Sequence, residues 1–134
     1  MICTYENYKG VIKEISFETC LGLHSEIAAE CSGDPDAEEL YDDLIVSAID
    51  YAGMRALWTI KDNDWKASHD DKRTSYHDGL IISVNVLARY LQKAGKAAAW
   101  RDTLGYETDK GGLDRKRIGD FGCFLAFVHG INGR

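Results

Sequence analysis

The chain contains a single proline, Pro35, among its 134 residues, and this scarcity constrains its fold more than any other feature. Proline ends or kinks helices, so one proline leaves long stretches of the chain open to helix formation. Apolar residues also recur at spacings of three and four, the spacing of one face of an α-helix. We therefore predict an all-α fold, a single compact bundle of four to five helices that forms one domain over residues 1–134.

The clearest helix start in the sequence is the pair Asp34-Pro35. An aspartate side chain accepts hydrogen bonds from the first backbone N–H groups of a helix, and proline is tolerated next to it because its missing N–H would be unpaired there. We expect this helix to continue to about residue 60. The helix before it should begin after the N-cap Ser16 and end near Gly33.

A third helix is predicted over residues 75–94, with Ser75 as its N-cap and Gly95 as its stop. The polar stretch over residues 61–74 should form a turn-like connection. A short helix over residues 96–104 and a last helix after Asp114 complete the bundle, whose core should come from the second, third and last helices. Residues 2–15 fit one face of a helix and would also suit a short hairpin, and we favour the helix.

The negative charge is concentrated in one third of the chain. The net charge is −6, yet eleven acidic residues and no lysine or arginine lie between Glu14 and Asp50, whereas residues 55–134 carry fourteen Lys or Arg against ten Asp or Glu. One interpretation is that these carboxylates are the solvated faces of two helices. The other is an acidic surface that binds a basic protein partner, because complementary charges speed association and select partners. The residues predicted to form this surface are Glu38, Glu39, Asp42 and Asp43.

The dipeptide His77-Asp78 opens an apolar run, as the His-Asp pair does in some metal-dependent phosphohydrolases. Such a site needs further ligands, and the candidates are His24 or His69 as an earlier histidine, and Asp102, Asp120 or Glu30 as a further carboxylate. The enzyme alternative is therefore a metal site formed by His77, Asp78 and Asp120. We favour a local explanation, in which Ser75 and Asp78 form a capping box at a helix N-terminus. On this basis we expect no metal, no cofactor and a non-enzymatic protein.

A short basic run lies at the start of the last predicted helix, where backbone N–H groups also attract phosphate. Together with Arg89 it makes a candidate anion site, whose residues are Arg89, Arg115, Lys116 and Arg117. So few cations neutralise too few phosphates for strong nonspecific duplex binding, and nucleic acid is not the expected partner. We favour an internal polar seam along the third helix, with Arg89 paired to a carboxylate of the second helix such as Asp50.

The four cysteines show no paired short spacing, so reduced thiols are expected. No apolar stretch reaches the length of about 18 residues that a membrane span needs, and the N-terminus lacks the pattern of a signal peptide. We therefore expect a cytoplasmic protein that does not enter the membrane.

Two segments, RTSYHDGLIISVNVLARYL over residues 73–91 and RKRIGDFGCFLAFVHG over residues 115–130, carry a resemblance to known proteins. The chain resembles small helical proteins encoded by phages and prophages of Gram-positive bacteria. The resemblance covers about the last sixty residues and includes no catalytic motif, so it assigns no functional residue. It implies a setting in which short acidic proteins bind host factors, including inhibitors of enzymes that act on nucleic acids.

Overall fold

The computed structural model describes residues 2–6, 12–104 and 116–131, which form five helices and one two-stranded sheet. The elements are β1 (Ile2–Glu6), β2 (Ile12–Ser16), α1 (Phe17–Cys31), α2 (Pro35–Ile60), α3 (Asn63–Lys93), α4 (Trp100–Leu104) and α5 (Lys116–Ile131). The predicted all-α helical bundle is confirmed, and the described part of the chain adds a small hairpin to it.

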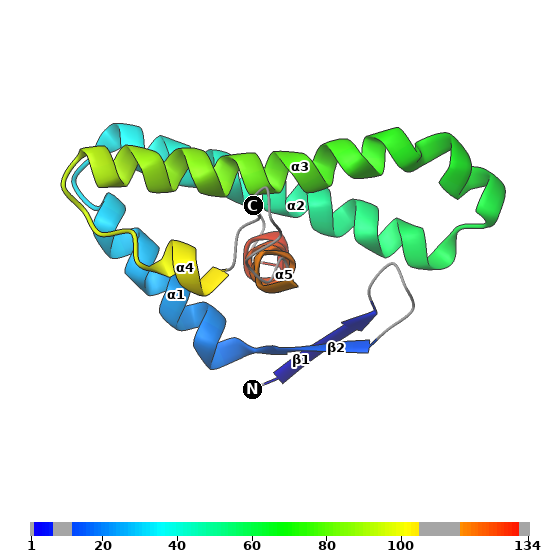
Figure 1. Ribbon diagram of the computed structural model, residues 1–134. Coiled ribbons are helices and arrows are strands. Elements are labelled where there is room, and N and C mark those ends of the chain that lie inside the picture. The colour runs from blue at the N-terminus through cyan, green and yellow to red at the C-terminus, as the bar shows by residue number, and fades with distance from the viewer. Residues whose placement is uncertain (1, 7–11, 105–115, 132–134) are drawn as a thin grey trace.

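The two longest helices, α2 and α3, lie side by side as an antiparallel pair, and α5 crosses the middle of that pair (Figure 1). Figure 1 also shows α1 and α4 near one end of the pair, while its other end extends beyond α5. As predicted, α2 packs against both α3 and α5, and α1 and α4 add side chains to the same core. The large side chains of this core include Trp100, Phe121, Ile27, Leu44, Leu80, Leu87, Leu91, Leu104 and Leu125.

The predicted bounds of α2 are confirmed from Pro35 to Ile60. The Asp34 carboxylate accepts hydrogen bonds from the backbone N–H groups of Asp36 and Ala37, at 3.1 and 3.2 Å, which satisfies two donors that have no partner within the helix. The preceding helix ends at Cys31, and Gly33 takes a φ of 80° that glycine adopts without strain.

The predicted start of α3 is wrong. The helix begins at Asn63, where the Asp62 carboxylate accepts a hydrogen bond from the backbone N–H of Trp65 at 2.9 Å. Residues 63–74 of the predicted turn are therefore helical, and Ser75 lies inside the helix, where it cannot serve as the N-cap. The end of α3 at Lys93 agrees with the prediction, and Gly95 has a φ of 87°.

The helix favoured for residues 2–15 is also wrong, because β1 pairs with β2 in an antiparallel ladder that joins Ile2 to Ser16 and Glu6 to Ile12. The helix predicted over residues 96–104 is confirmed only from Trp100, since Ala98 just before it has a φ of 49°. The predicted N-cap of the last helix, Asp114, lies outside the described residues.

Candidate protein-binding surface

One contact between α2 and α3 fixes which residues of the two helices share a face. The hydroxyl oxygens of Ser47 on α2 and Ser83 on α3 lie 3.1 Å apart. The residue after each serine, Ala48 or Val84, is buried in the core, whereas the residue before each serine is exposed. In an antiparallel pair, a step of one residue back along each helix turns the side chains of both helices toward the same side of the pair. The two exposed residues therefore lie together on the side opposite the core. We call this side of the α2–α3 pair the outer face.

The α2 half of the outer face is acidic. Helical spacing places Asp42, Asp43 and Asp50 within one turn of Val46, and Glu39 one turn further back. All four carboxylates are exposed, and none of them forms a hydrogen bond or ion pair with another residue in the part of the chain that the structure describes.

All four residues predicted to form the acidic surface are exposed on α2, and three of them, Glu39, Asp42 and Asp43, belong to the outer face. Glu38 is exposed as well, but it lies about 100° from Glu39 around the helix, so it is not part of the outer face. Asp50 was missed in the sequence, although its spacing of seven from Asp43 would have placed it on the same side.

Three exposed apolar side chains also belong to the outer face. Val46 on α2 is 48% exposed, and Ile82 and Val86 on α3 are 59% and 39% exposed. Ile82 and Val86 are one turn apart on the side of α3 that faces away from the core. Sequence reasoning missed them because their apolar run suggests core positions, and only the packing of α3 on α2 shows which members of the run remain outside. The outer face therefore combines an apolar centre with an acidic edge.

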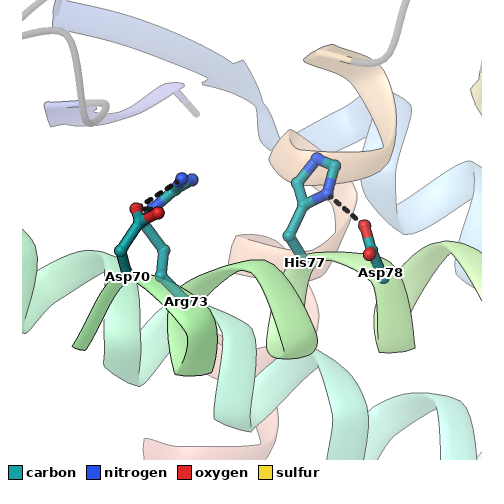
Figure 2. A network of polar contacts seen from close by, with 4 residues as sticks. All are labelled: Asp70, Arg73, His77 and Asp78. Carbon is teal, nitrogen blue, oxygen red and sulfur yellow. Dashed lines mark hydrogen bonds and ion pairs between the residues drawn. The ribbon is translucent and has the colours of Figure 1, made fainter. Parts of the chain in front are cut away.

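His77 and Asp78 contact each other at the surface of α3, with 3.2 Å between Nδ1 and Oδ1 (Figure 2). The His77 ring also lies 6.1 Å from the Tyr51 ring on α2. Among the described residues, no group of three or more His, Cys, Asp or Glu side chains is placed to hold a metal ion, so His77, Asp78 and Asp120 do not form such a site. The capping explanation of Asp78 is wrong too, because the residue lies in mid-helix.

Two carboxylates at the α1–α2 junction serve the fold. Glu30 accepts a hydrogen bond from Trp100 Nε1 at 2.6 Å and another from the backbone N–H of Ala98 at 3.0 Å. Asp34 accepts hydrogen bonds to both carboxylate oxygens from the Tyr90 hydroxyl, each at 2.9 Å. The backbone N–H of Ala37, followed by the Tyr90 hydroxyl, lowers the pKa of Asp34. Glu30 and Asp34 therefore join the acidic third of the chain to α3 and α4, and they are not available as ligands.

The other histidine considered as a ligand, His24, belongs to a polar cluster between α1, α2 and α5. Its Nδ1 is 2.6 Å from the Tyr41 hydroxyl, and its ring lies edge-on to His129 at 6.1 Å. Burial, and then the nearby His129, lower the pKa of His24, which keeps the imidazole neutral at pH 7. His69 instead stacks on the Trp65 ring at 3.8 Å. Both histidines are thus occupied by contacts within the chain.

The candidate anion site is described only in part. Arg89 is exposed and forms no ion pair with a described residue, so the predicted pairing with Asp50 is not formed. Arg115 and the side chains of Lys116 and Arg117 lie outside the described residues.

Comparisons of the chain with models of known protein families, with curated protein sequences and with solved structures find no match. Within residues 2–6, 12–104 and 116–131, no helix is both long and apolar enough to cross a bilayer. The function proposed below therefore rests on the geometry of the outer face.

Proposed function

We propose that this protein is a non-enzymatic protein-binding module, and that the acidic edge of its outer face binds a basic surface of a partner protein. The observation that carries the proposal is the row of exposed carboxylates at Glu39, Asp42, Asp43 and Asp50, none of which is neutralised by a described residue. Because these charges share one side of one helix, their fields add toward a partner approaching from that side.

If the carboxylates stood alone, a solvated helix face would explain them equally well. The neighbouring apolar residues distinguish the two explanations. Single exposed apolar residues are common on protein surfaces, but Val46, Ile82 and Val86 gather around one point of the α2–α3 contact. An apolar centre with a charged edge is the usual composition of a protein interface. This combination favours binding over solvation.

The resemblance to phage and prophage proteins supports a more specific version of the proposal. Enzymes that act on nucleic acids present basic surfaces, because they neutralise phosphate groups. An acidic protein that covers such a surface would block access to the nucleic acid. We propose a host enzyme of this kind as the partner and the cytoplasm as the place of the encounter.

The test is a pull-down from a host lysate with the intact chain as bait. Wild-type protein should capture a basic protein that is lost when the four carboxylates of the acidic edge, Glu39, Asp42, Asp43 and Asp50, are changed to Gln or Asn. The matched control carries the same kind of change at four exposed carboxylates outside α2, which are Glu26, Asp64, Asp71 and Asp102, and it should capture the partner as the wild type does. Raised salt should weaken capture, since surface charges are screened. Equal capture by both variants would refute the proposal.

A further inference from the structure

Two glycines lie inside the long helices at positions where packing within the chain does not require them. A Cβ atom built on Gly53 in α2 or on Gly79 in α3 meets no atom within 4 Å. Glycine in a helix interior lowers stability by about 1 kcal/mol relative to alanine. Gly119 in α5 is different, because a Cβ there would lie 2.8 Å from the Tyr51 hydroxyl oxygen. Gly119 is thus explained by close packing, whereas Gly53 and Gly79 are not.

Both unexplained glycines lie on the outer face. Gly53 follows Val46 by seven residues, and Gly79 precedes Ile82 by three, which are spacings that keep residues on one side of a helix. Measured along the helix axes from the contact between Ser47 and Ser83, Gly53 lies about 9 Å toward the C-terminus of α2, and Gly79 lies about 6 Å toward the N-terminus of α3. Since the helices are antiparallel, these two displacements have the same direction. The glycines therefore lie at nearly the same level, beside the apolar centre.

Because glycine has no side chain, the surface at Gly53 and Gly79 lets another helix approach closely beside the apolar centre. Helices pack by fitting the ridge of side chains of one into a groove of the other, and they approach most closely where side chains are small. Where α2 and α3 meet on the outer face, Gly53 lies on one helix and Gly79 on the other, and Val46 and Ile82 lie further along.

The charges of the outer face select the kind of helix. Asp42, Asp43 and Asp50 line the α2 edge, so the bound helix needs lysine or arginine along one side and apolar residues along the side that packs against α2 and α3. A second copy of this chain would bring the same acidic row to the contact, and like charges across an interface disfavour association.

We propose that the partner presents a basic amphipathic helix, which packs on the outer face between α2 and α3 and crosses closest at Gly53 and Gly79. This inference rests on the proposed function and makes it more specific, because it names the recognised element.

The experiment measures binding of two synthetic peptides to the intact chain by fluorescence anisotropy. One peptide, of about 18 residues, is built from Leu, Lys and Ala with leucines at helical spacing, and the other has the same composition with the leucines scattered. The helical peptide should bind at least about tenfold more tightly, a difference of about 1.4 kcal/mol. Changing Gly53 or Gly79 to methionine should weaken that binding by at least about tenfold, because the added side chain prevents this close approach.

The control is Gly22→Met, since Gly22 in α1 also has open surroundings but lies on another helix. Methionine favours helix over glycine, so urea unfolding of each variant should show that stability is not lowered. Equal binding of the two peptides would overturn the helical inference and leave the proposed function in place. Absence of binding by either peptide would overturn it too, and the lysate capture would then decide the proposed function separately. Self-association of the wild type that the Gly53 variant abolishes would assign the outer face to a second copy and refute the inference.

Discussion

Replacing Glu30 by alanine should destabilise the fold by about 3 kcal/mol, because two donors lose one shared acceptor. Trp100 is fully buried, and its Nε1 is 2.6 Å from the Glu30 carboxylate, which also accepts from the backbone N–H of Ala98. A buried donor left without a partner costs about 1–3 kcal/mol. Both donors belong to buried residues, Trp100 and Ala98, while the half-buried position of Glu30 lets water replace part of the lost contact.

The assay is urea unfolding at 25 °C followed by tryptophan fluorescence, with thermal unfolding as a second measurement. For a chain of this size the loss corresponds to a fall in Tm of about 10 °C. Glu30→Gln keeps one acceptor oxygen and should lose about 1 kcal/mol. Glu26→Ala, an exposed carboxylate on the same helix, is the matched control and should change stability by less than about 0.5 kcal/mol.

A double-mutant cycle separates this contact from general effects on α1. In a Trp100→Phe background the indole donor is absent, so Glu30→Ala should cost markedly less than it does in the wild type. If Glu30→Ala matched Glu26→Ala in the free energy of unfolding, or if the two changes were additive, the assignment of Glu30 as the acceptor that holds α4 would be refuted.

Three further outcomes follow from the structure. Gly53→Ala and Gly79→Ala should each stabilise the fold by about 0.5–1 kcal/mol in urea unfolding, whereas Gly119→Ala should destabilise it, and the opposite signs would contradict the packing described. Burial, with the nearby carboxylates, raises the pKa of Cys31 to about 11, so this thiol should resist a disulfide reagent at pH 8 until the chain is unfolded, and fast labelling of the native protein would contradict its burial. Because the pKa of His24 is lowered below its ordinary value of 6.5, the stability linked to it is present above that pH and lost as the pH falls, so His24→Gln should flatten the decline measured by thermal unfolding from pH 7 to pH 5.

The elements that could be predicted from the sequence are those with local end signals or a face in the core. Asp34 and Pro35 predicted the start of α2, and Gly95 predicted the end of α3, because caps and stops act through neighbouring backbone groups. The first three turns of α3 could not be found in the same way. They carry no apolar stripe, since this end of the α2–α3 pair extends beyond α5 and has little core to face (Figure 1).

In this part of α3, contacts between neighbouring side chains replace the support that a hydrophobic core gives elsewhere. Arg73 donates two hydrogen bonds to Asp70, one turn away (Figure 2). Its guanidinium also lies 5.0 Å from the centre of the Trp58 ring on α2. The Lys61 ammonium lies 5.7 Å from the Trp65 ring. Contacts between charged groups and rings of two helices depend on how the helices are placed, so the polar composition of residues 61–74 indicated a turn instead.

The acidic edge of the outer face could be predicted from composition, but its shape could not. Charge counts locate carboxylates along the chain without showing which of them share a side. Two of the acidic residues, Glu30 and Asp34, are hydrogen-bonded to Trp100 and Tyr90 across the fold, and such distant pairs leave no mark in the local sequence.

The contacts of Glu30 and Asp34 fasten only one end of the α2–α3 pair. Amide hydrogens near Asp42 and Val46 should therefore exchange with solvent slowly, while those near Lys61 exchange first, because opening is easiest where tertiary support is least. A ligand that contacts Asp42 and Val46 meets helices that are already rigid there, so little conformational entropy is lost in this part of the outer face when the complex forms.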